Sequence, residues 1–200
     1  YEFINAKVEE NIIDKNKLNL TFVIIETEKN YVEKINILGN SITRENVIRN
    51  SLIVDEGDAF NEILHNKSIN RIKSRGIFEK VESKILNGST KNQKIIEIKV
   101  EEKATGEISA GAGVGTSGAT IGFGVKENNY MGKGVRVNAN MAFTDSSVRG
   151  ELTFEDPNFR NSNNSLFTSF KSIKTDNLTN SGYETSNIGV SVGSNFEKYE

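Results

Sequence analysis

YVEKINILGN, residues 31–40, and KIIEIKVEE, residues 94–102, frame the stretch of the chain that decides its fold. The first is rich in β-branched residues up to Leu38 and then reaches Gly39-Asn40, a pair that ends strands in turns. The second alternates apolar Ile96, Ile98 and Val100 with charged residues, as a strand with one buried face does. We therefore expect one strand to open this stretch and another to close it.

The first of two predicted helices follows residues 41–42. Thr43 stands where an N-cap is needed, because its hydroxyl can accept a hydrogen bond from a free backbone N–H. Residues 55–58 (DEGD) break the pattern. The apolar residues between them share one helical face: Val47, Ile48 and Leu52.

A second helix is predicted from Asn61, another N-cap residue, to Gly76 at the C′ position. Residues 77–86 then form a strand and 87–90 a turn. Residues 30–104 thus predict one complete βααββ module. The helix stripe consists of Ile63, Leu64, Ile69 and Ile72, and the expected core of the module comprises Leu38, Ile48, Leu52, Leu64, Ile72, Phe78 and Ile98.

Residues 1–29 predict a hairpin, with strands over 3–13 and 18–26 and turn residues at 14–16. Two strands alone are marginally stable in water. We therefore expect this hairpin to close a preceding module of the same kind. The chain also opens on Tyr1 within a strand pattern, so we expect it to be a piece of a longer protein.

From residue 105 to residue 200 the composition and the hydrophobic pattern change. Thirteen of the 17 glycines lie there, and apolar and polar residues alternate strictly. The alternation predicts about six strands, with residues 165–174 the least regular. Segments of about ten residues of this kind are typical of a transmembrane β-barrel, which needs at least about eight strands, so more strands should follow residue 200. A soluble antiparallel sheet with one buried face would show the same alternation.

Composition excludes several function classes. The net charge of −2 is evenly mixed, which argues against nucleic acid as a partner. The chain has no cysteine and one histidine, His65, which we interpret as a surface or boundary residue. No apolar run reaches the length of a membrane helix. Gly111 to Gly115 lies within a strand pattern and lacks the following helix of a phosphate loop, and no carboxylates stand at catalytic or calcium-binding spacing, so we expect no enzyme activity, metal or cofactor.

Four motifs in this order give the chain a family resemblance. Two lie in the module, at residues 37–49 (including ILGN, Thr43 and VIR) and 74–81 (SRGIFEKV); two lie beyond it, at residues 128–134 (NNYMGKG) and 155–159 (EDPNF). The whole chain resembles the outer-membrane β-barrel assembly factors, which join POTRA modules to a barrel. It matches the end of a fourth POTRA module, a fifth module and the first barrel strands. Related POTRA-barrel translocation and secretion pores are the nearest alternatives, and a non-membrane β-sheet binding module remains open.

The resemblance implies POTRA modules in the periplasm and a barrel in the outer membrane that assembles unfolded outer-membrane protein clients. It implies contact with outer-membrane lipid and with accessory lipoproteins, the latter through Arg49 and Glu56; the alternative is that these two residues are solvated charges at a helix end. Independently, a three-stranded module leaves an edge on which a client strand can add by its backbone. We place that edge at the strand carrying Ile77, Phe78, Val81 and Ile85.

The first strand after the module, residues 106–116, is rich in glycine. Glycine loses conformational entropy in a strand and offers no cross-strand contact, so this strand should pair weakly. We predict a weak barrel seam there. It involves Gly106, Ile108, Ser109, Gly111, Gly113 and Gly115, and the resemblance implies that client strands enter at it; small residues that merely make room in the barrel are the alternative.

Overall fold

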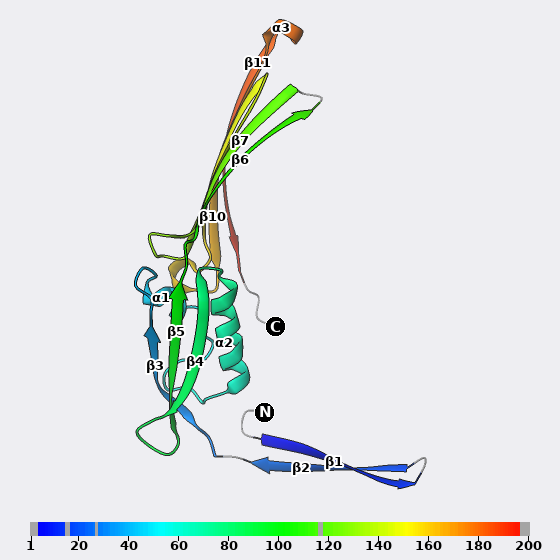
Figure 1. The fold of residues 1–200 in the computed structure, drawn as a ribbon, viewed down its shortest axis with the longest axis vertical. Coiled ribbons are helices and arrows are strands. Elements are labelled where there is room, and N and C mark those ends of the chain that lie inside the picture. The colour runs from blue at the N-terminus through cyan, green and yellow to red at the C-terminus, as the bar shows by residue number, and fades with distance from the viewer. Residues whose placement is uncertain (1–3, 15–16, 27, 116–117, 197–200) are drawn as a thin grey trace.

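The computed structural model describes residues 4–14, 17–26, 28–115 and 118–196, and its strands form three sheets (Figure 1). A two-stranded hairpin lies at one end, a small mixed sheet with helices lies in the middle, and a six-stranded sheet extends from it. The two larger sheets correspond to the two halves of the chain that differ in glycine content.

The hairpin consists of β1 (Ile4–Asp14) and β2 (Lys17–Glu26), paired antiparallel. Its apolar side chains are largely exposed; Phe22 and Ile24 are 64% and 66% accessible. Among the described residues the hairpin pairs with no further strand. That it completes a preceding module stays a prediction, and Phe3, Lys15, Asn16 and Thr116 lie outside the described residues.

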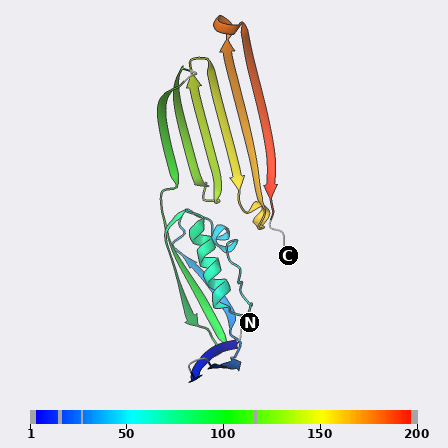
Figure 2. The ribbon, with the colours of Figure 1, turned by 90° about the vertical axis from the view of Figure 1, so that its right-hand side faces the viewer.

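The middle module has the predicted βααββ order. It contains β3 (Tyr31–Leu38), α1 (Glu45–Arg49), α2 (Glu62–Ser74), β4 (Phe78–Asn87) and β5 (Gln93–Glu102). The sheet order is β3-β5-β4, with β3 and β5 parallel and β4 and β5 antiparallel. Strand β5 is therefore central, β3 and β4 are the two edges, and α2 lies across one face (Figure 2).

The core of the module forms between this face and the helices. Ile48, Ile72 and Ile98 are fully buried and Phe78 is 6% exposed, as predicted. Leu52 and Leu64 are only partly buried and pack against this core. Leu38 was expected in the core but is 46% exposed, because Ile35 and Ile37 take the inward positions of β3 and the alternation turns Leu38 outward.

The helix boundaries differ from the sequence prediction in two places. Thr43 is not the N-cap of α1; Arg44 occupies that position without a side-chain cap, and Thr43 is buried in the preceding loop. Ile63 is 68% exposed, so it is not part of the apolar stripe of α2. Asn61 does cap α2, accepting from the N–H groups of Ile63 and Leu64, and Gly76 has the expected positive φ of 69°.

The six-stranded sheet is a continuous antiparallel series in chain order, from β6 to β11 (Figure 2). Strands β6 and β11 are its edges, so it is open in this chain. A 3-10 turn, η1 (Phe159–Asn161), and a short helix, α3 (Leu178–Ser181), lie in two of its connections. Its strands are β6 (Gly106–Gly115), β7 (Gly118–Tyr130), β8 (Val135–Thr144), β9 (Ser147–Asp156), β10 (Ser165–Asn177) and β11 (Tyr183–Asn195).

The strand register sorts this sheet into an apolar and a polar face. One row across all six strands is apolar: Ile108, Val125, Ala139, Leu152, Phe170 and Val190. The next row on the other face is small or polar: Ser109, Gly124, Asn140, Glu151, Lys171 and Gly189. Strand β10 is regular although its own alternation is weak, because its register is set by both neighbours.

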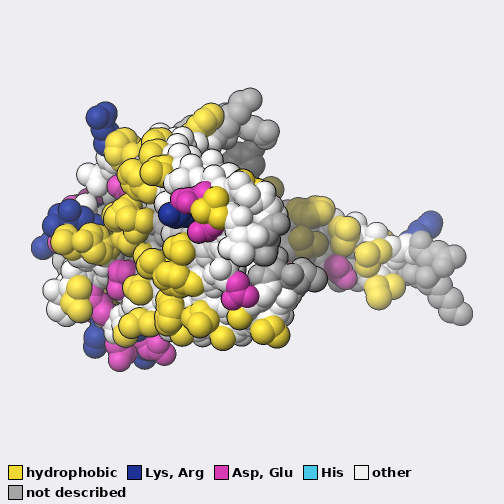
Figure 3. Space-filling view, turned by 90° about the horizontal axis from the view of Figure 1, so that it is seen from above, with side chains coloured by type: hydrophobic (Ala, Val, Ile, Leu, Met, Phe, Trp, Pro, Cys, Tyr) yellow, Lys and Arg dark blue, Asp and Glu magenta, His cyan; other side chains and the backbone are white. Residues whose placement is uncertain are grey.

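The apolar face is exposed. Ile108, Phe123 and Val192 are 87%, 54% and 67% accessible, and hydrophobic side chains gather in an arc when the sheet is seen from above (Figure 3). A contiguous exposed apolar surface of this kind is typical of contact with lipid or protein rather than water. Within the described residues, no helix is long and apolar enough to cross a membrane.

Candidate functional site

The POTRA-like module and the six-stranded sheet meet at a polar junction. The β7–β8 turn and the β9–β10 connection both contact the α1 side of the module. Each of these loops carries one of the family motifs noted above, at residues 128–134 and 155–159, and each meets a motif of the module. Segments separated by more than 80 residues in sequence are thus brought together.

Asn129 organises the β7–β8 turn. Its amide Nδ2 donates to the Thr43 hydroxyl at 2.9 Å, and its Oδ1 accepts from the Gly134 N–H at 2.8 Å. Its own backbone N–H donates to Glu127 at 2.7 Å. The burial of Thr43 therefore reflects its contact with the β7–β8 turn, whose Asn129 donates to the Thr43 hydroxyl, and not helix capping.

Two glycines allow this turn to approach the module closely. Gly132 has φ +69°, and a Cβ there would lie 2.1 Å from the Ile42 carbonyl oxygen. A Cβ at Gly134, which has φ +66°, would lie 2.9 Å from Val47 Cγ1. The Gly132 carbonyl in turn accepts from the Arg44 N–H at 2.9 Å. Any side chain at Gly132 would separate the two modules.

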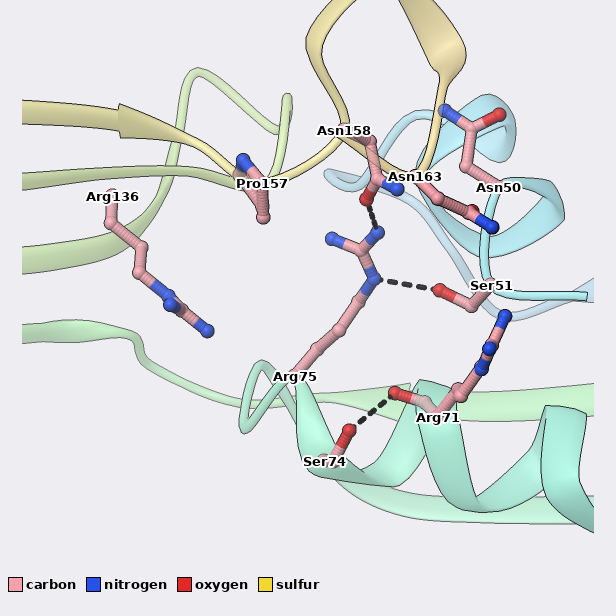
Figure 4. A pocket seen from close by; sticks show the side chains of 9 residues that line it. All are labelled: Asn50, Ser51, Arg71, Ser74, Arg75, Arg136, Pro157, Asn158 and Asn163. Atoms are coloured by element: carbon pink, nitrogen blue, oxygen red, sulfur yellow. Dashed lines mark hydrogen bonds between the residues drawn. The ribbon is translucent and has the colours of Figure 1, made fainter. Parts of the chain in front are cut away.

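Arg75, at the C-cap of α2, extends across the junction (Figure 4). Its Nε donates to the Ser51 hydroxyl at 2.8 Å within the module, and its Nη2 donates to the Asn158 side-chain oxygen in the β9–β10 connection. Burial and the nearby Arg136 lower the pKa of Arg75, while Asp156 opposes the shift. The guanidinium is a partly desolvated charge held by neutral acceptors.

The β9–β10 connection makes a second contact through Asn161. Its Oδ1 accepts from the side-chain amides of Asn46 and Asn50, at 3.3 and 3.0 Å. Asn161 adopts a positive φ of 58°, a conformation that asparagine tolerates better than most residues. The connection therefore docks on both α1 and the C-terminal end of α2.

Glu102, the last residue of β5, fixes the loop before α1 from the other side. Its carboxylate accepts from the N–H groups of Thr43 and Ile42, at 2.6 and 2.9 Å, and from the Ser41 hydroxyl at 3.2 Å. Burial would raise the pKa of Glu102, but these hydrogen bonds outweigh it and hold the pKa below its ordinary value. The carboxylate therefore holds residues 41–43 in place ahead of α1, without capping the helix itself.

Arg49 and Glu56, the predicted partner-binding pair, lie together on the outer edge of β3. The Ile35 N–H donates to Glu56 Oε1 at 2.9 Å, and the Ile35 carbonyl accepts from Arg49 Nη2 at 3.1 Å. Arg49 also contacts Glu56 at 3.6 Å and Glu45 at 2.7 Å. The two side chains therefore occupy the outward backbone groups of Ile35, as a pairing strand would.

Strand β4, the predicted strand-addition edge, is the other edge of the same sheet. No strand or loop of the described chain pairs with its outer side. Ile77, Phe78 and Val81 point into the core at 1%, 6% and 8% exposure, and Ile77 precedes the strand. Of these four predicted residues, Ile85 alone has an exposed side chain, at 43%, so a strand that adds at this edge would pair mainly through backbone hydrogen bonds.

Strand β6, the predicted seam, is an edge of the six-stranded sheet, and within the described part of the chain it pairs with β7 alone. All six predicted seam residues lie in it, and every position of the strand is exposed. A Cβ at Gly111, Gly113 or Gly115 would meet nothing within 4 Å. These three glycines therefore contribute no side-chain packing to β6, both if the strand forms a weak seam and if the glycines merely make room in a barrel.

His65 was interpreted as a surface or boundary residue, and that interpretation is wrong. It is 5% exposed on the inner face of α2, with Nε2 3.0 Å from the Ser83 hydroxyl on β4. Burial lowers its pKa. Its packing beside Phe60 makes it a structural core residue.

Sequence reasoning assigned no role to Arg75, Asn129, Asn158 or Glu102, which build the junction. The motifs at residues 74–81, 128–134 and 155–159 contain polar residues and glycines that an isolated strand does not require. Their presence could have indicated a contact between these loops. What was missing was the knowledge that these loops face one another. Among the described residues, no group of three or more histidine, aspartate or glutamate side chains could hold a metal.

The POTRA family model, described as a surface antigen variable number repeat, matches residues 30–103. The BamA outer membrane protein assembly factor of Neorickettsia risticii is 30% identical over 138 residues, which cover 68% of this chain and 18% of that protein. The BamA of Neisseria meningitidis is 28% identical over 133 residues, covering 66% of this chain and 17% of that protein. The chain therefore spans about a fifth of the length of the curated relatives it matches.

Solved structures agree in fold. The crystal structure of BamA from Haemophilus ducreyi lacking POTRA domains 1–3 matches with a TM-score of 0.76 at 22% identity, covering 94% of this chain and 37% of that one. CdiB from Acinetobacter baumannii matches less well, with a TM-score of 0.52 at 14% identity, covering 94% of this chain and 38% of that one.

Proposed function

Because this chain is a BamA-like segment, a POTRA domain followed by strands of an outer-membrane barrel fold, we propose that it assembles and inserts other β-barrel proteins. The POTRA domain would lie in the periplasm and the apolar face of the sheet in the outer membrane. The names of the relatives, outer membrane protein assembly factors, support this proposal. The proposed activity needs no cofactor, because it consists of strand pairing and release.

The observation that carries the proposal is the asymmetry of the POTRA sheet. On β3, Arg49 and Glu56 bind the outward groups of Ile35, and the outward groups of Val32 are bonded to the backbone of residues 57 and 58. On β4 no described strand or loop pairs with the outer backbone groups, so another strand could bind there. An extended client can add there by main-chain hydrogen bonds with little demand on its sequence, as an assembly factor with many clients requires.

The glycine-rich β6 gives the sheet a second such edge. In a closed barrel this strand would meet a final strand beyond residue 200, and its lack of side-chain packing would make that seam the weakest one. A client strand that leaves β4 would then pair at β6 before release into the membrane. The proposed path runs from one free edge to the other.

Photocrosslinking tests the first step. A photoreactive amino acid replaces Lys84 on β4 of the full-length protein, and the matched variant carries it at Lys34 on β3; both positions are exposed. During import of a labelled barrel substrate, we expect adducts at position 84 and several-fold fewer at position 34. Equal adducts at both positions, or none at position 84, would contradict the role of β4.

Accessory lipoproteins are the proposed partners of the Arg49–Glu56 surface. Because Glu56 also accepts from Ile35, its replacement affects the β3 edge as well as the surface charge. Glu56→Gln retains an acceptor oxygen while removing the charge, whereas Glu56→Lys removes both. Loss of lipoprotein capture in both variants, with the POTRA domain folded, supports a direct charge contact; normal capture by Glu56→Gln opposes it.

The second candidate function is a POTRA-barrel translocation or secretion pore, which the fold likeness to CdiB favours. A pore conducts a polypeptide through its lumen and leaves other barrels unaffected. Depletion of the full-length protein distinguishes the two: an assembly factor would be needed for the folding of many outer-membrane barrels, and a pore for the export of particular substrates.

A further inference from the structure

A polar cavity of about 250 Å³ lies within the junction (Figure 4). Three arginines line it: Arg71 and Arg75 from the POTRA domain and Arg136 from β8. The remaining lining residues are neutral, and they are Asn50, Ser51, Ser74, Pro157, Asn158 and Asn163. A cavity that gathers three cations and no lining carboxylate, in a chain of net charge −2, has a local charge opposite to that of the whole chain.

The charge of Arg75 in this cavity is only partly compensated. Arg136 contacts Glu155 at 3.3 Å, whereas Arg75 donates hydrogen bonds to the neutral side chains of Ser51 and Asn158. Desolvation and the proximity of Arg136 disfavour the charged form of Arg75 and lower its pKa, and the nearby Asp156 offsets this only in part. Because a partly buried charge is costly without an opposite charge, an anion in the cavity would be favoured by all three guanidinium groups.

We propose that this cavity binds a phosphate group and that the bound group joins the POTRA domain to the sheet. Guanidinium forks match the oxygens of phosphate with paired, charge-assisted hydrogen bonds. The volume is several times the roughly 30 Å³ that one water occupies in the liquid, which leaves room for a phosphate and its remaining hydration. Asn158 and Asn163 add amide groups from the sheet side, so the ligand would be held by both modules.

The placement of the cavity leaves two sources for the phosphate group. Arg136 lies on the polar face of β8, where it is in register with Glu155. This face is opposite to the exposed apolar face of the sheet, so a soluble phosphate ester could reach the cavity. It also lies at the end of the strands next to the POTRA domain, which a phospholipid headgroup could reach from the rim. The inference does not depend on the assembly activity proposed above.

Binding is tested with the full-length protein in a phosphate-free maltoside detergent. Inorganic phosphate is titrated by calorimetry for the soluble source, and retention of phosphatidylglycerol over a phosphate-free diacylglycerol is measured by native mass spectrometry for the lipid source. We expect saturable binding in at least one arm. Arg71→Gln and Arg136→Gln should each weaken it about tenfold, the size of one charge-assisted hydrogen bond.

Two controls make the result specific. Lys99→Gln removes an exposed cation from the far side of the domain and should leave binding unchanged. Arg75→Lys retains the charge but loses the fork and should weaken binding even where the junction stays intact. The proposal is overturned by absence of saturable binding in both arms, by equal binding in Arg71→Gln and Lys99→Gln, or by binding of a carboxylate peptide in place of phosphate.

Discussion

Gly132→Ala should open the junction between the POTRA domain and the sheet. The alanine Cβ would stand 2.1 Å from the Ile42 carbonyl oxygen, a backbone atom that cannot rotate away. The turn must therefore withdraw, and the hydrogen bond from the Arg44 N–H to the Gly132 carbonyl is lost with it. The φ of +69° adds strain for any residue with a Cβ.

The magnitude follows from separating these two effects. The left-handed conformation costs about 1–2 kcal/mol for a non-glycine residue. Gly182→Ala is the matched control, because Gly182 has φ +73° and a Cβ there meets nothing within 4 Å. The additional cost at Gly132, from overpacking and the lost hydrogen bond, is about 1–3 kcal/mol, or roughly a 5- to 150-fold shift in the junction equilibrium.

Amide hydrogen exchange of the full-length protein in detergent measures this shift. Exchange at Arg44 should accelerate 5- to 150-fold in Gly132→Ala, on the estimate above, and stay at the wild-type rate in Gly182→Ala. Exchange at Ile98, inside the POTRA core, should remain unchanged in both variants. Equal protection of Arg44 in the two variants would refute the role assigned to the turn.

Three further predictions concern the POTRA domain. Phe78→Ala, at a position 6% exposed, should lower the free energy of unfolding by roughly 3–5 kcal/mol in urea, whereas Leu86→Ala, 44% exposed on the same strand, should cost far less. The Glu102 carboxylate has a pKa below its ordinary 4.5, so its stabilisation is complete above that pH and is lost as the pH falls through the lower folded value; Glu102→Gln should remove this part of the acid dependence, as measured by thermal unfolding from pH 6 to pH 3. The His65 pKa is lowered from 6.5, so its stabilisation is present above pH 6.5 and is lost as the pH falls through the lower folded value; a stability profile that keeps its full slope in His65→Gln would exclude this residue as the cause.

Local patterns predicted much of this fold because each element carries its own signals. Asn61 and Gly76 bracket α2 as their capping chemistry requires. The alternation of apolar residues predicted the faces of five strands of the large sheet, whereas the alternation of β10 is weak and its register follows from its neighbours. The prediction for Leu38 was wrong because the alternation of β3, which turns Ile35 and Ile37 inward, turns Leu38 outward.

Tertiary contacts explain what the sequence could not reveal. Thr43 was predicted to cap a helix. Instead its N–H donates to Glu102 and its hydroxyl accepts from Asn129, and these residues lie 59 and 86 residues away along the chain. Arg49 and Glu56 were predicted to contact a partner, and only the folded structure reveals that they bind the backbone of Ile35 at the edge of β3. A side chain that bonds to a distant backbone leaves no local pattern, so such roles become visible only once the segments are brought together.

Locking the barrel seam tests the central claim, that free strand edges carry the function, most directly. In the full-length protein, cysteine at Ser109 is paired with cysteine at the facing position of the final barrel strand. A Ser169–Ser191 cysteine pair across β10 and β11 serves as control, since those strands are already joined. Insertion of a labelled barrel substrate is then followed in liposomes under oxidising and reducing conditions. We predict that the oxidised seam stops insertion, that reductant restores it and that the control pair has no effect. Full insertion activity with the seam oxidised and the barrel folded would contradict the account.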